Sequence, residues 1–240
     1  MAFRIEKDGD FVATTASGQT FRSRRLLVTT GLVDEVPDLP GLRERWGIDV
    51  LHCPLCHGWE WRDRATVLLV RTPADVHKAL VVTRLTKDLT LVLDGVDDQA
   101  IDDEQWELLK AADVQVVSGP AVEIVVESNH LTGVRTADGR LVKAEVLYAS
   151  TPLALQDELL RSLGARTVQG PRGEVVEVDA HGLTSVPGVW AAGNAVDPNA
   201  QIVHAASDGY RAAQAITAKL MMEDLRAELK RSGNTDRHGR

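Results

Sequence analysis

The sequence predicts an α/β protein with two domains. An apolar run at 65–70, a helical pattern that continues to about residue 86 and a second apolar run at 89–93 form a βαβ unit. Such units build parallel, nucleotide-binding sheets. Two further apolar runs, 25–31 and 188–194, lead to glycines, as short buried strands often do. With 240 residues, the chain can form one large domain or two ordinary ones.

The segment before the βαβ unit is predicted to be mostly β-structure. Short strands separated by glycine-containing turns are expected at 3–6, 11–14 and 20–22, with turns at 8–10 and 18–19. The buried strand at 25–31 follows. The prolines and glycine of 37–41 then mark a loop that connects two domains.

The segment after the βαβ unit mixes helices and short strands. A helix is predicted at 102–112, with acidic residues at its start. Strands are expected at 114–117, 121–126, 131–135 and 145–148, with a hairpin turn at Asp138-Gly139. A short helix at 152–164, a loop at 170–173, an alternating strand at 175–179 and a long helix from about 205 to 229 complete the fold. The polar tail 232–240 is predicted to be disordered.

Composition excludes several classes of protein. Apolar residues make up 44% of the chain and charged residues 26%, as in globular domains. The net charge of −8 disfavours nucleic acid and anionic membranes as partners. We find neither an apolar run of roughly 20 residues, which a membrane span requires, nor a signal-peptide pattern in residues 1–25. A reducing cytoplasm is therefore the expected compartment.

The only two cysteines of the chain, Cys53 and Cys56, lie two residues apart on either side of Pro54-Leu55. This spacing can form a disulfide, and a helix that starts there is expected to stabilise one thiolate. The pattern therefore favours a reversible dithiol/disulfide centre. Three alternatives remain: a zinc site, which normally needs further Cys or His ligands; a C-x-x-C-H haem attachment at His57; and two cysteines that only pack.

Three motifs in this order resemble a known family, the two-domain flavoprotein disulfide reductases. Residues 27–31 (LVTTG) resemble the "ATG" strand of these enzymes, and residues 186–194 (VPGVWAAGN) resemble their second flavin motif. Between them, the Cys53/Cys56 pair occupies the position of the redox disulfide of low-molecular-weight thioredoxin reductases. The sequence HGWE at 57–60 is similar to a subgroup of actinobacterial and fungal proteins that includes dithiol oxidases of disulfide natural products.

The resemblance implies a fold of two Rossmann-like, three-layer domains that bind FAD and NAD(P). It assigns 1–46 and 152–231 to an incomplete FAD-binding domain and 47–151 to a central NAD(P)-binding-like domain. It also implies a role for each residue at the dithiol. Cys56 would contact the isoalloxazine of the flavin, and Cys53 would exchange with the substrate disulfide. His57 would handle the thiol proton, which an imidazole can do near neutral pH; it could also be an exposed residue without a role.

The resemblance also implies a set of flavin-binding residues. The helix that starts at His204 would direct its N-terminal dipole at the flavin pyrimidine ring. Asn194 stands where the family usually has Asp; it can bond a hydroxyl but carries no charge. The complete set of residues expected at FAD is Thr30, Gly31, Gly193, Asn194, His204, Ala205 and Ala206.

Two departures from the family pattern are expected to change the chemistry. The chain begins at the hairpin before the ATG strand, so the βαβ unit with the G-x-G-x-x-G loop that cradles FAD is expected to be absent. In the central domain, Arg71, Pro73 and Val76 replace the fingerprint glycines, and their side chains are expected to obstruct a pyrophosphate. Asp94 lies where a ribose-binding carboxylate is usual, but such a residue is also common in turns. Direct reduction by NADPH is therefore not expected.

The sequence thus predicts an FAD-dependent, thioredoxin reductase-like oxidoreductase that exchanges thiols and disulfides through Cys53 and Cys56. Its partner would be a thioredoxin-like protein or a small dithiol or disulfide. Oxygen or another protein would accept the electrons, and by resemblance the protein would be a homodimer. Two alternatives remain: an NAD(P)H-dependent thioredoxin reductase read from a truncated start, and a flavin-free remnant that acts as a binding or regulatory module.

Overall fold

The chain divides into two compact units. The computed structural model describes residues 2–5, 10–170 and 172–235. Residues 34–152 form what we call the central unit, and residues 1–33 and 153–240 form the two-segment unit. The chain crosses between the units through β5 (Leu32–Asp34) and β14 (Leu153–Leu155), which pair with each other.

The central unit is built on a five-stranded parallel sheet in the order β6-β13-β7-β8-β9. These strands are β6 (Val50–Leu51), β13 (Val146–Ala149), β7 (Thr66–Val70), β8 (Leu89–Leu93) and β9 (Gln115–Ser118). Every residue of β7 and β8 is buried, because both faces of the sheet are covered. The predicted βαβ unit therefore forms the middle of the sheet.

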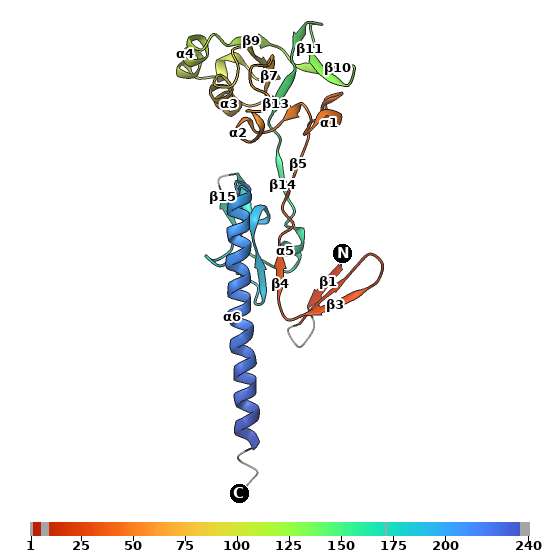
Figure 1. Cartoon of the computed structure of the whole chain (residues 1–240), viewed down its shortest axis with the longest axis vertical. Helices are drawn as coiled ribbons and strands as arrows, with labels where there is room; N and C mark the ends of the chain where they lie inside the picture. The colour runs from red at the N-terminus through yellow and green to blue at the C-terminus, as the bar shows by residue number, and fades with distance from the viewer. Residues whose placement is uncertain (1, 6–9, 171, 236–240) are drawn as a thin grey trace. The chain divides into compact units, whose positions relative to one another are not determined.

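Three layers make up the central unit. Val67 and Leu69 of β7 pack toward an antiparallel meander, while Leu68 and Val70 pack toward helices, as the two-residue period of a strand requires. The meander contains β10 (Ala121–Glu127), β11 (His130–Thr136) and β12 (Leu141–Lys143). The helical layer contains α3 (Val76–Val82) and α4 (Asp103–Ala111), with short 3-10 turns η1 (Pro73–Asp75) and η2 (Asp98–Ala100) before them. Figure 1 shows the helices and the meander on opposite sides of the sheet. The predicted α/β, Rossmann-like class is confirmed.

The predicted boundary after residue 46 differs from the observed one after residue 33. Residues 34–46 belong to the central unit because α1 (Leu42–Arg45) packs there: Leu42 is fully buried in the cluster that contains Val67 and Leu69. The Pro-rich segment that suggested a linker thus belongs to one unit, where Leu39 packs against the core.

A buried ion pair ties α1 to the meander. Arg45 Nε donates to Asp49 Oδ1 at 2.8 Å, and the backbone N–H of Leu131 donates to Asp49 Oδ2 at 3.0 Å. The second carboxylate oxygen also faces the Arg45 guanidinium, and Arg45 reaches Asn129 Oδ1 at 2.9 Å. Burial pushes the pKa of Asp49 up, but these hydrogen bonds outweigh it and hold the pKa below its usual value. The pair anchors the segment that leads into β6 and the cysteines.

The two-segment unit joins both ends of the chain. β4 (Leu26–Val28) pairs in parallel with β17 (Val189–Ala191), so the two strands predicted from 25–31 and 188–194 are neighbours. Around them lie β1 (Ala2–Ile5), β2 (Phe11–Thr14), β3 (Thr20–Ser23), α5 (Glu158–Ser162), β15 (Thr167–Gly170), β16 (Gly173–Val176), η3 (Gly193–Ala195) and α6 (Ile202–Thr235). The predicted turn at 8–10 and Pro171 of the predicted loop lie wholly or largely outside the described residues.

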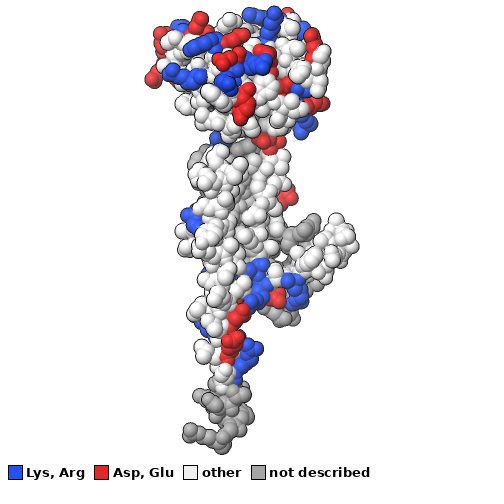
Figure 2. Space-filling model, in the orientation of Figure 1, with Lys and Arg blue, Asp and Glu red and all other residues white. Residues whose placement is uncertain are grey.

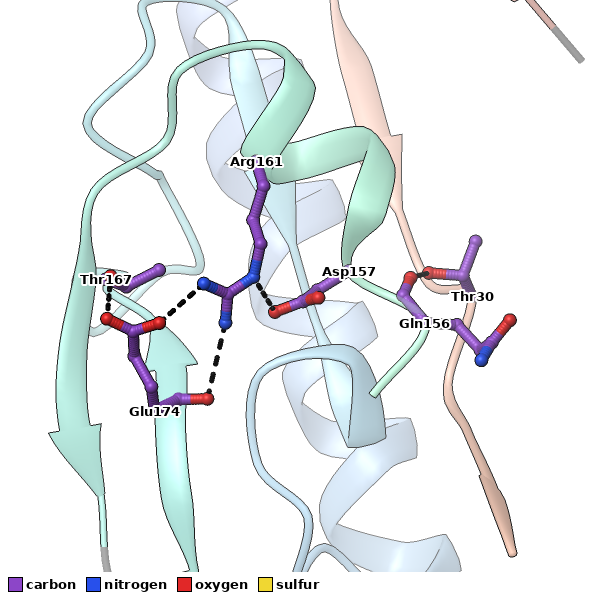
Figure 3. A network of polar contacts seen from close by, with 6 residues as sticks. All are labelled: Thr30, Gln156, Asp157, Arg161, Thr167 and Glu174. Carbon is purple, nitrogen blue, oxygen red and sulfur yellow. Dashed lines mark hydrogen bonds and ion pairs between the residues drawn. The ribbon is translucent and has the colours of Figure 1, made fainter. Parts of the chain in front are cut away.

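A charged network fastens α5 to the β15–β16 hairpin, as Figure 3 shows. Arg161 donates from Nε to Asp157 at 2.9 Å and from a terminal nitrogen to Glu174 at 2.6 Å. Glu174 also accepts a hydrogen bond from Thr167 at 2.7 Å.

The helix predicted at 152–164 is shorter in the structure, because residues 153–155 form β14 and α5 begins at Glu158.

The closing helix α6 is longer than the sequence suggested. It begins at Ile202 rather than near 205 and continues to Thr235, so residues 232–235 of the predicted tail are helical; residues 236–240 lie outside the described part. Arg24 pairs with Asp224 and Arg25 with Glu223, which fasten α6 to the chain just before β4. Among the described residues, none of the helices combines the length and apolarity that crossing a bilayer requires.

Candidate active site

The two cysteines lie on a tight turn at the end of β6. Cys53 has an extended backbone and caps the short helix α2 (Pro54–His57), whose first position is taken by Pro54. Pro is favoured there because its missing N–H would be unpaired in any case. The backbone N–H groups of Cys56 and His57 both donate to the Cys53 carbonyl, at 3.2 and 3.3 Å. This turn places the two sulfur atoms beside each other.

Cys53 Sγ and Cys56 Sγ lie 2.7 Å apart, and both residues are free thiols. A disulfide bond measures about 2.05 Å, so a small side-chain movement would close it. The S–H of Cys56 donates to Cys53 Sγ; this hydrogen bond, then burial, then the charge of Cys53 raise the pKa of Cys56 to about 11. In the reduced pair, the effect of the neighbouring sulfur on the pKa of Cys56 therefore outweighs any stabilisation by the N-terminus of α2, which has only four residues.

Gly58 explains why the turn can pack against the sheet layer. A Cβ at this position would lie 2.2 Å from the Pro54 carbonyl oxygen and 2.3 Å from Leu85 Cδ1. Since real Cβ atoms do not approach so closely, any other residue would push α2 away from Leu85. The glycine after His57 is thus required by close packing and not by its backbone angles.

The outer surface of the turn is apolar and exposed. Leu55 and Trp59 expose 81% and 68% of their surface, and Arg62 lies over the Trp59 ring, 4.3 Å from its centroid. Cys56 and His57 are exposed beside them. The predicted site residues Cys53, Cys56 and His57 therefore lie together on one accessible turn, and a substrate could reach the dithiol.

Tyr148 is a neighbour of the dithiol that the sequence did not reveal. It is buried in β13, whose Tyr148 pairs with Leu51 of β6. Burial, and then the charges of Cys53 and Glu60, raise the pKa of Tyr148 to about 12. A tyrosine within a continuous apolar strand gives no sequence signal of this kind, because its proximity to Cys53 depends on which strands pair.

Val76 lies in the core and does not contribute to the obstruction expected at the nucleotide loop. Val76 is fully buried in the layer between α3 and the sheet, so its side chain faces the core and not the loop. Arg71 is exposed, and its Nε lies 3.5 Å from Asp94 Oδ2. Asp94 also accepts a hydrogen bond from the backbone N–H of Ala121 at 2.9 Å. The carboxylate suggested for ribose is therefore engaged in holding β10.

The predicted flavin residues come together in the two-segment unit. Thr30 and Gly31 follow β4, Gly193 and Asn194 follow β17, and these strands are parallel neighbours. Both pairs therefore lie at the same end of the strand pair. Thr30 donates its hydroxyl hydrogen to the Gln156 carbonyl, and Gln156 donates its N–H to the Gly31 carbonyl at 2.9 Å. Figure 3 shows the first of these contacts.

The start of α6 meets the same end of the strands. Gly193 has a positive φ of 67°, and a Cβ there would lie 3.2 Å from Ala205 Cβ, so the glycine allows β17 to approach the helix. Asn194 donates its amide hydrogens to the carbonyls of Asp197 and Ala200, at 3.0 and 2.9 Å. Only its oxygen can then contact a ligand. His204 Nδ1 accepts the N–H of Gln201 at 3.3 Å and is exposed with Ala206 at the first turn of α6.

These residues fit the flavin end of FAD. The arrangement offers close-approaching backbone at Gly193, an amide oxygen that can accept a ribityl hydroxyl, and the N-terminus of a long helix that favours negative charge. Cys53, Cys56 and His57 belong to the central unit, whereas Thr30, Gly31, Gly193, Asn194, His204, Ala205 and Ala206 belong to the two-segment unit.

Comparison with known proteins agrees with this architecture. The family model described as pyridine nucleotide-disulphide oxidoreductase matches residues 2–209. A thioredoxin reductase of Claviceps purpurea, tcpT, is 30% identical over 220 residues, which cover 89% of this chain and 67% of the relative. Another, sirT of Leptosphaeria maculans, is 28% identical over 238 residues, 94% of this chain and 72% of the relative.

A solved structure has a fold similar to that of this chain. The crystal structure of HlmI superposes with a TM-score of 0.85 at 37% identity, covering 98% of this chain and 72% of HlmI. The family resemblance drawn from the motifs at 27–31, 53–56 and 186–194 is thereby confirmed. The chain belongs to the pyridine nucleotide-disulphide oxidoreductase family and is a thioredoxin reductase-like enzyme.

Proposed function

We propose that this enzyme transfers electrons between a dithiol substrate and FAD through Cys53 and Cys56, without NADPH as a donor. The observation that carries the proposal is the pair of sulfur atoms 2.7 Å apart on one turn, with Cys56 exposed and Cys53 half-buried. Among the described residues, no group of three His, Cys, Asp or Glu side chains could hold a metal ion.

The exchange is a sequence of two displacements. A substrate thiolate attacks Cys53 Sγ of the Cys53–Cys56 disulfide, the S–S bond breaks, and Cys56 leaves with the electron pair. The second substrate thiolate attacks the substrate sulfur of the mixed disulfide and releases Cys53. The substrate loses two electrons and two protons as its disulfide forms, and the cysteine pair gains both. In the opposite direction, Cys53 is the thiol that attacks a substrate disulfide.

Cys56 needs a proton when it leaves. A departing thiolate leaves more readily when it is protonated, so a proton donor beside Cys56 favours the step. His57 follows Cys56 directly and is exposed at the end of α2. We assign it the transfer of this proton, since imidazole exchanges protons near neutral pH.

FAD supplies a two-electron acceptor when it is bound. Gly193, Asn194 and the first turn of α6 would hold the flavin end, with Thr30 and Gly31 beside them. The helix N-terminus favours negative charge on the ring system that it faces. Dioxygen or a redox protein is then the final acceptor, because Arg71 and Pro73 stand where a pyridine nucleotide needs glycines.

The surface supports a homodimer as the working assembly. Met221, Leu225 and Leu229 recur at every fourth residue of α6 and expose between 52% and 72% of their surface. Such a stripe favours pairing with a second helix. Light scattering should then give about twice the chain mass of 26.1 kDa; a monomer mass would contradict the dimer.

On the face of the central unit that Figure 2 shows, charges of both signs are interspersed, and such a surface does not favour binding to nucleic acid.

The test is dithiol consumption by the FAD-supplemented full chain. We expect dithiothreitol to be oxidised with uptake of dioxygen, and we expect the Cys53→Ser and Cys56→Ser variants to lose this activity. Leu55→Ala, which changes an exposed neighbour but neither sulfur, is the matched control and should retain most of it. Dithiol oxidation that survives either cysteine substitution would refute the proposal. A chain that binds no FAD and self-associates would instead favour the flavin-free binding module.

A further inference from the structure

The loop after β7 has its backbone donors occupied by a side chain of the protein itself. Asp75 lies at the end of η1 and exposes only 5% of its surface. Its Oδ2 accepts the backbone N–H of Arg71 at 3.1 Å, and that of Thr72 at 2.9 Å, and also the Thr72 hydroxyl at 3.0 Å. Together these contacts form a capping box around the start of the helical segment.

These donors are the ones that a dinucleotide would need. In a βαβ unit the pyrophosphate binds at the loop between the first strand and the helix, where backbone N–H groups point at it. β7 is also the point at which the strand order reverses, since the chain continues to β8 on one side and β13 lies on the other. Ligands of open parallel sheets bind at this switch point.

Contacts from outside the loop keep the carboxylate of Asp75 in place. Ser150, which follows β13, donates its hydroxyl hydrogen to Asp75 Oδ1. Lys78 of α3 donates to Ser150 Oγ at 2.7 Å and to the His52 carbonyl at 3.2 Å. Asp75 is therefore linked through Ser150 and Lys78 to the residue before Cys53, and it cannot turn away without breaking this chain of contacts.

The space beside the loop is open but carries negative groups. A cavity of about 580 Å³ lies over the carboxyl ends of β7 and β13, and its lining includes Glu35, Arg71, Thr72, Asp75, Ser150 and Thr151. Arg71, the cation of this lining, lies 3.5 Å from Asp94. The cavity volume is that of an ordinary ligand pocket. Exclusion of a nucleotide must then come from the chemistry of the lining and not from lack of space.

We propose that Asp75 acts beside Arg71 and Pro73 to exclude pyridine nucleotides, because its carboxylate takes the place of the dinucleotide phosphate on the loop after β7. A phosphate would have to displace Asp75 from the Arg71 and Thr72 N–H groups and would meet a like charge of low exposure. This inference deepens the proposed function, since it names a further residue, besides Arg71 and Pro73, behind the absence of an NADPH donor.

The experiment measures nucleotide binding and needs no flavin. The full chain and its Asp75→Ala and Asp75→Asn variants are titrated calorimetrically with NADPH and, separately, with inorganic pyrophosphate. We expect the affinity of Asp75→Ala for NADPH to be at least about tenfold higher than that of the parent. Asp75→Asn, which keeps the volume of the side chain and loses its charge, should show a smaller gain. Asp88→Ala is the matched control, because it removes an exposed carboxylate at the opposite end of the sheet.

Near-ultraviolet circular dichroism identifies which variants retain the parent fold. Binding by a folded Asp75 variant that equals the parent within error would overturn the inference, as would tight NADPH binding by the parent chain or an equal gain in Asp88→Ala. Because binding is measured without FAD or a dithiol, these results are independent of whether the chain oxidises dithiols. The inference and the proposed function can therefore fail separately.

Discussion

At the scale of single residues, the chemistry of the dithiol depends on the contact between its two sulfur atoms. Cys56 donates a hydrogen bond to Cys53 Sγ, and this hydrogen bond is the largest cause of the raised pKa of Cys56. Cys56 is also exposed, so the neighbouring sulfur matters more than burial. The two cysteines are therefore unequal: Cys56 Sγ donates the hydrogen bond and Cys53 Sγ accepts it.

This inequality predicts the alkylation behaviour of the reduced protein. In Cys53→Ser, the hydrogen bond to sulfur is lost, and the pKa of Cys56 should fall from about 11 toward its ordinary value of 9.0. At pH 8 the thiolate fraction of Cys56, and with it the rate of iodoacetamide modification, should rise roughly tenfold or more. Mass spectrometry of Cys56 across a pH series measures this rate. An unchanged midpoint in the variant would contradict the assignment, and Leu55→Ala should behave like the parent.

At the scale of elements, the buried Arg45–Asp49 pair holds the approach to the cysteine turn. Both side chains are nearly inaccessible, and the pair joins α1 to Leu131 of the meander. Removing one partner of a buried pair leaves the other charge without compensation. We therefore expect Asp49→Ala to lower the free energy of unfolding by about 3–5 kcal/mol in urea titrations. The exposed control Asp88→Ala should change it by about 0.5 kcal/mol or less, and an equal effect of both would contradict this role.

The Arg45–Asp49 pair makes the free energy of unfolding depend on pH. The pKa of Asp49 lies below its usual value in the folded protein, so the unfolded chain binds its proton more readily. The contribution of Asp49 is complete above the unfolded pKa of roughly 3.9 and is lost as the pH falls through the folded pKa. The loss of stability between neutral pH and pH 3 should accordingly be smaller in Asp49→Ala than in the parent. Urea titrations at both pH values measure the difference, and equal losses would contradict it.

The sequence predicted elements with strong local patterns and missed contacts between distant segments. The apolar runs at 65–70 and 89–93 were correctly predicted as β7 and β8, because strands buried on both faces are continuously apolar. The pairing of Asp75 with Ser150, 75 positions away, has no local signal. Nor does the inward orientation of Val76, which depends on how α3 packs. The length of α6 was underestimated because its last turns are polar all round, a pattern shared by helices and tails.

At the scale of the whole molecule, each unit has its own core and its own share of the proposed chemistry. The central unit carries the dithiol and the closed nucleotide loop, and the two-segment unit carries the residues that fit a flavin. The boundary lies after residue 33 because α1 packs with the central sheet. The roles assigned to His57 and to the FAD-binding residues stay predictions.

The visible absorption spectrum of the FAD-reconstituted full chain under anaerobic conditions distinguishes reduction of the flavin by a dithiol from reduction by NADPH. We expect a bound flavin band that bleaches when dithiothreitol is added and does not bleach with NADPH. The Cys53→Ser variant should bind flavin equally well and fail to bleach with the dithiol. A flavin band that bleaches with NADPH, or that bleaches with the dithiol in Cys53→Ser, would contradict NADPH-independent reduction of the flavin through Cys53.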